Sequence, residues 1–209
     1  MRLLSERYRL SAIDVGKFGS LKASGMKFDV KAWRAEGLGH VSVMRAKGFF
    51  GLMKMDTLII NPTETDLPLY SYDRIFAMGN DTLIVELYDT LVGTFDASGL
   101  EAVKEKHAAL PERDPGAHWY DGIKLAASIS KKGKKQQTPE LDEMTEEHFK
   151  AYLASAPESA ADVQEKLKKA SYYVEGLLKN GGPSTDVFKK EIGEERTEGL
   201  FKTVLFGIG

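Results

Sequence analysis

A single carboxylate interrupts one of the most apolar stretches of the sequence. Residues 82–88 alternate so that three apolar side chains face one side of an expected strand, while Glu86 faces the other. A carboxyl group on a strand that is covered on both faces is partly desolvated, which favours its neutral form. Such a group is suited to donate a proton to a bound substrate. The alternative is a structural role, in which Glu86 pairs with an Arg or Lys of a neighbouring element.

Several other chemistries are excluded by what the sequence lacks. It contains no cysteine, which removes disulfides, thiolate nucleophiles and cysteine-ligated iron–sulfur or zinc sites. Its glycine pairs have the wrong spacing for a phosphate or dinucleotide loop, and no hydrolase nucleophile elbow is present. The histidines show no metal-ligand spacing with one another. They are His40, His107, His118 and His148. An enzyme with this sequence needs a mechanism without a bound cofactor, or a substrate that is itself the redox-active group.

The composition is that of an ordinary globular protein. Of 209 residues, 42% are hydrophobic and 29% are charged, which favours a single domain over residues 1–209 with room for a pocket. The net charge of −2 argues against a general nucleic-acid binder. No apolar run approaches the roughly 20 residues that span a bilayer, and the charged N-terminus lacks the apolar stretch of a secretory signal. We therefore expect a cytoplasmic protein with no nucleic-acid partner and no membrane partner.

The strands that would position Glu86 lie between residues 27 and 88. Alternating apolar residues predict about five strands there, and the short loops between them favour an antiparallel meander. The last two strands form a hairpin with Met78-Gly79-Asn80-Asp81 as its turn. Because residues 82–88 are apolar on both faces, this strand is expected to be central, in a sheet that lies between helix layers.

Helical sequence follows the strands. Helices are predicted over residues 99–109, 145–156 and 160–179, and from Ser184 or Thr185 to beyond residue 204. Ser98 and Thr145 are the expected caps of the first two, and Gly193 is able to divide the last helix into two. Between these helices, residues 130–137 form a basic, polar run without an apolar anchor. We expect that run to be mobile.

Two stretches of the chain resemble the ferredoxin-dependent bilin reductases. In the first, the dipeptide Leu67-Pro68 is followed by aromatic and small residues, Asp73, a hairpin and an acidic residue on the returning strand. The second begins at Lys179-Asn180, continues through VFKKEIGEE (residues 187–195) and ends in KTVLFG (residues 202–207). It is similar to the C-terminal helix of the family, including the closing Val-Leu-Phe. Together the two stretches cover about a third of the chain.

The resemblance implies an α+β fold, a three-layer α/β/α sandwich with a central antiparallel β-sheet and C-terminal helices. It also implies that a bilin, a linear tetrapyrrole, binds between the sheet and those helices. The bilin is itself the redox centre, receives electrons one at a time from ferredoxin or flavodoxin, and needs no permanently bound metal or flavin. The chain would be a distant, bacterial oxidoreductase of this family.

The resemblance also assigns roles to single residues. Glu86 takes the position of the family's catalytic Asp and would protonate the bilin after each electron arrives. Asp73 aligns with a second family Asp, although an Asp there also fits a turn or a strand end. Near where some members place a catalytic His, this chain has Asp56 or Thr57. The proton-transfer network of those members therefore cannot be copied here.

Further residues are implied as contacts of the substrate or the electron donor. Asn180 matches a family position before the last helix, but Asn followed by Gly also ends helices for conformational reasons. Arg45, Lys47, Lys54 and Arg74 are candidates to bind the propionate groups of a tetrapyrrole, and Asp56 is a further candidate contact of the substrate. The basic run Lys131 to Lys135 is either a docking site for an acidic ferredoxin or flavodoxin, or a solvated loop.

Three functions are compatible with these observations. The first is the reduction of a bilin or a related linear tetrapyrrole with one-electron donors and a carboxyl proton donor. The second is a non-catalytic tetrapyrrole-binding or carrier protein on the same fold, which the missing histidine favours. The third is an unrelated α+β protein whose two motifs match by chance.

Overall fold

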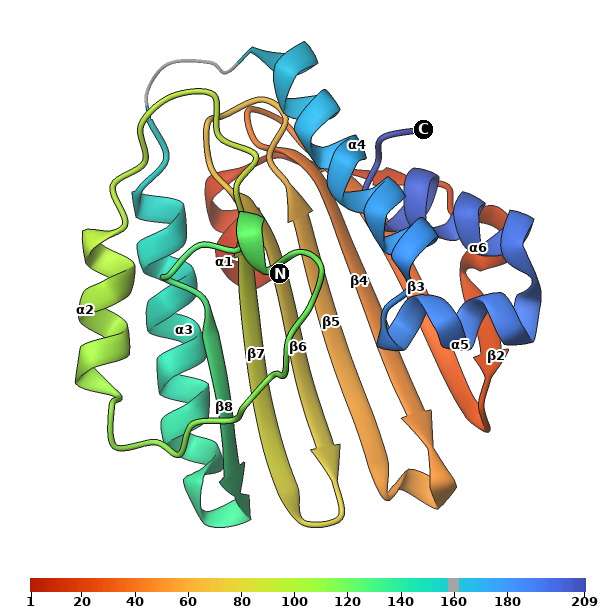
Figure 1. The fold of residues 1–209 in the computed structure, drawn as a ribbon, viewed down its shortest axis with the longest axis horizontal. Coiled ribbons are helices and arrows are strands. Elements are labelled where there is room, and N and C mark those ends of the chain that lie inside the picture. The colour runs from red at the N-terminus through yellow and green to blue at the C-terminus, as the bar shows by residue number, and fades with distance from the viewer. Residues whose placement is uncertain (158–161) are drawn as a thin grey trace.

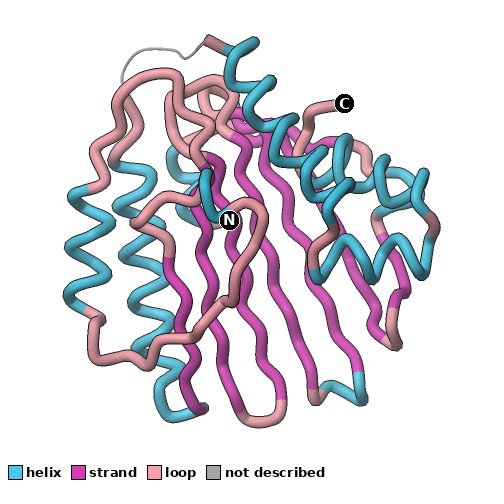
Figure 2. Tube along the Cα trace, in the orientation of Figure 1, coloured by secondary structure: helices cyan, strands magenta, loops and turns pink. Residues whose placement is uncertain are grey.

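The computed structural model describes residues 1–157 and 162–209, and within them an eight-stranded antiparallel sheet forms the centre (Figures 1 and 2). The strands are β1 (Leu10–Ile13), β2 (Ser20–Ala23), β3 (Met26–Ala35), β4 (Gly39–Gly48), β5 (Met53–Asn61), β6 (Leu69–Ala77), β7 (Asn80–Tyr88) and β8 (Ile129–Lys134). Their order across the sheet is β1-β3-β4-β5-β6-β7-β8, and β2 pairs with the other end of β3. The predicted meander is confirmed as β3 to β7, with short edge strands added on both sides.

The expectation of a mobile run over residues 130–137 is wrong. Residues 129–134 form β8, which pairs with β7, and Lys135–Gln137 form a short 3-10 turn. Lys131 is only 3% exposed. Its ammonium group donates to the carbonyl oxygen of Leu110 at 3.0 Å and to the carboxylate of Glu112 at 2.5 Å. The lysine stem thus packs inward while its charge is satisfied, which a reading of Lys as an exposed residue cannot anticipate.

The predicted hairpin turn is confirmed but is narrower than expected. Met78 and Gly79 both have positive φ, 51° and 75°, and Ala77 pairs directly with Asn80. Two central residues in the left-handed region give the turn the twist that neighbouring strands require. Asn80 and Asp81 therefore belong to β7 rather than to the turn.

The helices are α1 (Arg2–Arg7), α2 (Ser98–Lys106), α3 (Thr138–Ala154), α4 (Val163–Asn180), α5 (Pro183–Ile192) and α6 (Glu194–Gly199), and a π-helical turn, Leu200–Leu205, follows α6. Gly193, with φ 83°, divides the predicted last helix into α5 and α6. None of the helices in the described residues is both long enough and apolar enough to span a bilayer.

The two predicted helix caps are wrong. α3 already begins at Thr138, so Thr145 lies inside the helix, where its hydroxyl donates to the carbonyl oxygen of Leu141. Ser98 is the first residue of α2, and its amide donates to the carboxylate of Asp96. Asp162 caps α4 by accepting from two backbone amides of the first turn. Residues 160 and 161 of the predicted helix 160–179 lie outside the described residues.

Helices cover both faces of the sheet, which confirms the three-layer sandwich. In Figure 1, α4, α5 and α6 lie in front of the sheet, and buried residues of α4, α5 and the π-helical turn form one apolar cluster with the facing side of β3 to β7. The buried residues of α1, α2 and α3 form a second cluster with the opposite side. The side chains of β7 alternate between the two faces as predicted. Leu83, Val85 and Leu87 belong to the second cluster, and Tyr88 belongs to the first.

Polar side chains of the sheet fasten the C-terminal segment to its face. The imidazole Nε2 of His40 bonds to the carbonyl oxygen of Val204 at 2.8 Å, and the hydroxyl of Ser42 donates to that of Leu205 at 2.8 Å. The side-chain amide of Asn61 donates to the carbonyl oxygen of Phe206 at 2.8 Å. Burial lowers the pKa of His40, which keeps the ring neutral in this structural role. The closing Val-Leu-Phe of the chain is thereby held over β4 and β5.

The Leu-Pro loop before β6 joins both helix layers to the sheet. The ammonium group of Lys166 on α4 is fully buried and contacts the carboxylate of Asp66 at 3.2 Å and the carbonyl oxygen of Leu67 at 2.7 Å. From the opposite layer, the hydroxyl of Tyr152 on α3 donates to the carbonyl oxygen of Pro68 at 2.9 Å. Because the loop satisfies polar groups from both layers, it fixes where β6 begins.

Candidate active site

A cavity of about 490 Å³ lies between the sheet and the C-terminal helices. Its floor is formed by β3 to β7 and its roof by α4, α5 and the C-terminal turn, and residues 113–120 of the loop before β8 close one side. The volume is within the roughly 300–1,000 Å³ of small-molecule sites. Apolar and aromatic side chains dominate the lining, among them Phe28, Met44, Met55, Tyr120, Tyr173 and Phe188.

Two carboxylates stand together on the floor of this cavity. Asp73 on β6 and Glu86 on β7 both line it. They lie on one face of the sheet because Asp73 pairs with Ile84, two residues before Glu86 on β7. Such diagonal positions on neighbouring strands are within reach of each other. The structure therefore brings together the two residues that the sequence singles out for proton transfer.

Asp73 is held in an environment that favours its protonated form. Burial raises the pKa of Asp73 to about 6, and the negative charge of Glu86 contributes to the rise. A hydrogen bond from the Thr57 hydroxyl to Asp73 Oδ1, at 2.5 Å, acts in the opposite direction but does not cancel the effect of burial. Thr57 also lines the cavity, so it is Thr57 that occupies the cavity face of β5 where the resemblance implies a His.

Glu86 combines the two roles that the sequence leaves open. The hydroxyl of Tyr88 donates to Glu86 Oε2 at 2.5 Å. The ammonium group of Lys124 is 3.9 Å from Oε1, whereas it is 2.8 Å from Asp121. The side chain of Glu86 keeps 16% of its surface exposed. The carboxylate is thus anchored by a tyrosine and only loosely paired with a lysine, and its remaining surface faces the cavity.

An aromatic group forms the wall next to Glu86. The rings of Tyr88 and Tyr173 stack with centroids 3.9 Å apart, and Tyr120 meets Tyr88 edge-on at 5.5 Å. Burial raises the pKa of Tyr173 well above its usual value, which keeps this hydroxyl neutral. Trp119 packs directly on Gly176 of α4, where a Cβ atom would lie 2.1 Å from the indole ring. The loop therefore packs closely on α4, and this close approach requires a glycine at position 176.

The same loop contributes two polar side chains that sequence reasoning missed. Arg113 lines the cavity, and its guanidinium group donates to the hydroxyl of Ser130 at 3.3 Å. His118 stacks on Tyr120 with its ring centroid 4.8 Å away. The Nδ1 atom of His118 is buried and has no hydrogen-bond partner among the described residues. Three consecutive aromatic residues in a loop, His118 to Tyr120, are the signal that could have indicated this wall.

A second, charged cavity of about 550 Å³ lies on the other side of Glu86. It shares Glu86, Arg113 and Pro115 with the first cavity. Lysine and glutamate side chains from α2 and β8 line much of it. Glu86 therefore stands between an apolar space suited to an organic ligand and a charged space suited to water and protons.

Three of the other predicted contact residues lie on the opposite face of the sheet. Arg45 on β4 and Asp56 on β5 form an exposed ion pair with their side chains 3.3 Å apart. Arg74 is 3% exposed and is held by Asp81 at 2.5 Å on the α3 side. None of the three lines the cavity. Because β-strand side chains alternate, each is one residue out of phase with a cavity residue.

Asn180 is also outside the cavity. It is the last residue of α4 and is exposed to solvent. The following glycine, Gly181, has φ 82°, so the Asn-Gly pair acts here as a helix end. Nearby residues at the start of α5, Gly182, Ser184 and Thr185, line the cavity instead.

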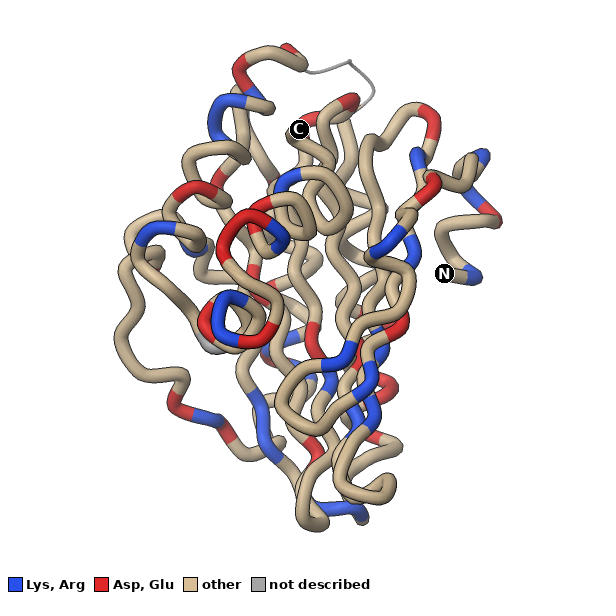
Figure 3. Tube along the Cα trace, turned by 90° about the vertical axis from the view of Figure 1, so that its right-hand side faces the viewer, with Lys and Arg blue, Asp and Glu red and all other residues tan. Residues whose placement is uncertain are grey.

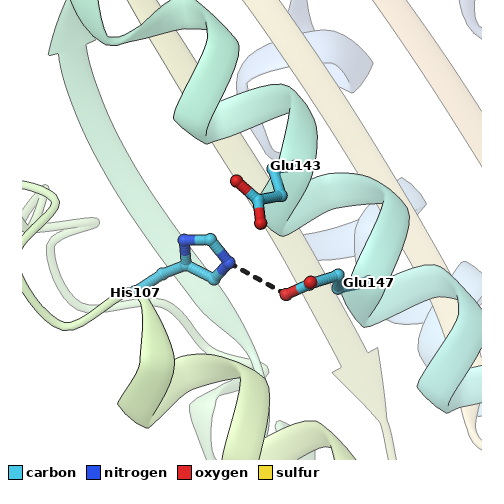
Figure 4. A group of neighbouring side chains, drawn as sticks. All are labelled: His107, Glu143 and Glu147. Atoms are coloured by element: carbon cyan, nitrogen blue, oxygen red, sulfur yellow. Dashed lines mark hydrogen bonds and ion pairs between the residues drawn. The ribbon is translucent and has the colours of Figure 1, made fainter.

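One group among the described residues has the spacing of metal ligands, and none of its members lines either cavity. His107 at the end of α2 faces Glu143 and Glu147 on α3, with ligand atoms within 4.8 Å of one another (Figure 4). The ammonium group of Lys106 is 2.9 Å from Glu143 and 2.5 Å from Glu147, and His107 Nε2 is 3.0 Å from Glu147. Lys106 supplies the positive charge that a metal ion would bring, so an ion-pair network accounts for the group.

Comparison with known proteins places the fold. No protein-family model matches the sequence, and no curated protein matches it. The structure is similar to that of phytochromobilin synthase from tomato in complex with biliverdin. The TM-score is 0.79 at 13% sequence identity, over 99% of this chain and 80% of that chain. The two proteins share one fold. At this identity the likeness concerns the fold, and it agrees with the α/β/α fold that the two sequence motifs imply.

Proposed function

We propose that this protein reduces a linear tetrapyrrole bound in the cavity between the sheet and the C-terminal helices. The observation that carries the proposal is the pair of carboxyl groups, Asp73 and Glu86, on the floor of an aromatic-lined cavity. The fold supports it, because a protein with the same fold was solved with biliverdin. Electrons arrive one at a time from a ferredoxin or flavodoxin, and the tetrapyrrole is the redox centre.

The cavity offers a planar, conjugated ligand suitable contacts. Its apolar floor and aromatic walls exclude water and flank the ligand's rings. Arg113 and His118 present nitrogen atoms at the side that the loop closes, where the ligand's propionate groups can accept hydrogen bonds. Arg113 and His118 thus replace Arg45 and Arg74 as the residues expected to bind the propionate groups.

The carboxyl groups supply the protons. Reducing one double bond consumes two electrons and two protons, so each electron that reaches the ligand raises its basicity and calls for a donor. Asp73 accepts the Thr57 hydrogen bond at Oδ1, which leaves Oδ2 to carry the proton. After it has given up its proton, Glu86 receives a new one through the charged cavity behind it, where Lys124 and solvent lie next to the carboxylate. Neither step requires the family His.

The proposal is tested by anaerobic reduction of biliverdin with reduced ferredoxin, followed by absorption spectroscopy. The unmodified chain should convert bound biliverdin, by successive one-electron transfers, to a product reduced by two electrons. Glu86→Gln and Asp73→Asn should bind it with similar affinity but convert it at least about a hundredfold more slowly, the usual effect of losing a proton donor. Asp56→Asn, at an exposed carboxylate on the opposite face of the sheet, is the matched control. Equal rates in all four proteins would contradict the assignment of the donors.

A carrier protein is the alternative on the same cavity. The observation that favours it is Thr57, which stands where the resemblance implies a histidine. A carrier would bind biliverdin and release it unchanged in the presence of reduced ferredoxin.

A further inference from the structure

Exposed apolar side chains gather at one edge of the sheet. The exposed fractions are 56% for Phe49, 109% for Phe50 and 75% for Leu52 in the β4–β5 turn, and 94% for Met78 in the β6–β7 turn. The two turns are neighbours, because Met53 at the base of the first pairs with Ala77 at the base of the second. We call Phe49, Phe50, Leu52 and Met78 the apolar tips. A cluster of this kind on a folded protein marks a binding surface.

Three of the apolar tips also hold a strained backbone. Phe49, Phe50 and Met78 have φ angles of 51°, 55° and 51°. The left-handed region is unfavourable for bulky residues, and Gly or Asn would occupy it with less strain. A fully exposed phenylalanine in this backbone conformation does not contribute to the stability of the fold. Strain of this kind indicates that the side chains are used for binding.

A row of lysines lies directly behind the apolar tips. Lys22, Lys27, Lys47 and Lys54 are successive cross-strand partners on β2, β3, β4 and β5, and all four are exposed. Like charges opposite one another destabilise a sheet. Among the described residues, only Lys27 of this lysine row has a carboxylate within ion-pair distance, Asp29 at 2.9 Å. Basic segments are visible along the strands toward the lower end of the molecule in Figure 3.

The distance between the apolar tips and the lysine row fits the distance between the apolar interior and the headgroups of a lipid bilayer. Leu52 immediately precedes β5 and Lys54 is the second residue of β5, so at most about 7 Å of chain separates them. Apolar groups of surface-bound proteins enter the bilayer by roughly 5–10 Å, and lysines at that distance meet anionic headgroups. We propose that this edge of the sheet binds an anionic bilayer surface, with the apolar tips inserted and the lysine row on the headgroups. The expectation of no membrane partner rested on the missing apolar run, which a surface contact does not require.

The edge that binds the bilayer is also an end of the cavity. Ser24, Phe49 and Met53, which belong to this edge, line the cavity floor or its margin. The bilayer contact that we propose therefore lies next to this end of the cavity. The proposal goes beyond the proposed function and does not depend on it, since lipid binding is measured without a tetrapyrrole.

The test is flotation of the full chain with vesicles of phosphatidylcholine alone and of equal parts phosphatidylcholine and phosphatidylserine. We expect flotation with the mixed vesicles, loss of flotation at high salt because the headgroup attraction is screened, and little binding to phosphatidylcholine alone. Two double variants, Phe50→Ser with Leu52→Ser and Lys47→Gln with Lys54→Gln, should each weaken binding by at least about tenfold. Tyr172→Ser, at a residue 64% exposed on α4, is the control and should bind unchanged.

The fold of the variants is checked independently. Phe50→Asn removes an exposed side chain and relieves the strained φ, so it should weaken vesicle binding while the melting temperature stays equal or rises. Absence of flotation by the unmodified chain, or equal flotation by the double variants, would overturn the proposal. So would a dimer that the Phe50→Ser and Leu52→Ser changes dissociate, or binding to an acidic protein without binding to vesicles.

Discussion

Asp73 and Glu86 share a cavity but are held by different partners. Asp73 is bonded by a threonine hydroxyl, and burial raises its pKa to about 6. Glu86 is bonded by a tyrosine hydroxyl and has a lysine 3.9 Å away on the side of the charged cavity. The two carboxyl groups therefore lie in different environments: burial favours the protonated form of Asp73, whereas Glu86 borders the charged cavity.

Asp73 should make the stability of the protein depend on pH in an unusual direction. The pKa of its carboxyl group is raised on folding, from an ordinary value of 3.8 to about 6, so the folded state binds the proton more tightly. Stability from this group is complete below about pH 4 and is lost as the pH rises through about 6. Relative to Asp73→Asn, the unmodified protein should lose up to about 3 kcal/mol in free energy of unfolding over that range. Urea titrations of both proteins between these pH values measure it, and parallel curves would contradict the assignment.

Arg113 should contribute to ligand affinity although Arg45 should not. Arg113 lines the cavity, whereas Arg45 pairs with Asp56 on the opposite face. Arg113→Ala should weaken biliverdin binding by about tenfold or more, the effect of losing a charged hydrogen bond to a carboxylate. Arg45→Ala is the matched control and should leave the dissociation constant unchanged. A larger effect of Arg45→Ala would place the propionates on the other face.

At the residue scale, the sequence identified the floor of the site but not its wall. Glu86 is recognisable because it is a lone carboxylate on an apolar strand, and Asp73 because it follows the Leu-Pro motif. Arg113 and His118 lie in a loop whose path depends on Trp119 packing against Gly176 of α4. That contact joins residues far apart in the chain, so no local pattern predicts it.

At the scale of elements, the cavity depends on how the loop before β8 packs on α4. Trp119 fills the space above Gly176, and the rings of Trp119 and Tyr120 lie 5.4 Å apart, edge to face. The strands β3 to β7 were predictable because one face of each is apolar and their turns are short. β8 was not, because its lysines read as exposed while Lys131 is buried against Glu112.

Gly176→Ala should disturb the cavity wall. The added methyl group would lie 2.1 Å from the Trp119 ring, so the ring and its loop must move. We expect a loss of about 1 to 3 kcal/mol in stability, as for other overpacked sites, and weaker biliverdin binding. Gly122→Ala in the same loop is the control, because a Cβ atom there meets nothing within 4 Å. Unchanged stability and binding in Gly176→Ala would show that the loop is not fixed by this contact.

At the scale of the molecule, one buried ammonium group ties α4 to the sheet. Lys166 is fully buried, with Asp66 and the carbonyl oxygens of Leu67 and Thr90 as partners. Desolvation lowers its pKa, and the charge of Asp66 opposes this effect. Because Asp66 also accepts from the amides of Val92 and Gly93, the loops at this end of the sheet form one network. This network joins α4 to the sheet, and the cavity lies between these two layers.

Removing this charge should be costly. Lys166→Met leaves the Asp66 carboxylate without its buried counter-charge, and we expect a loss of about 3 to 5 kcal/mol in free energy of unfolding. Lys168→Met, two residues away with 77% of its side chain exposed, should change stability by less than about 0.5 kcal/mol. Urea unfolding followed by circular dichroism compares the two. A small effect at Lys166 would mean that water replaces the ammonium group.

We propose that the cavity between the sheet and the C-terminal helices binds a linear tetrapyrrole. The most direct measurement is an absorption titration of the purified chain with biliverdin, repeated with Ile84→Trp, which fills the cavity floor beside Asp73 and Glu86. We expect a saturable spectral shift at one biliverdin per chain, lost in Ile84→Trp while the variant stays folded. No saturable shift in the unmodified protein, or an equal shift in the filled variant, would contradict the claim.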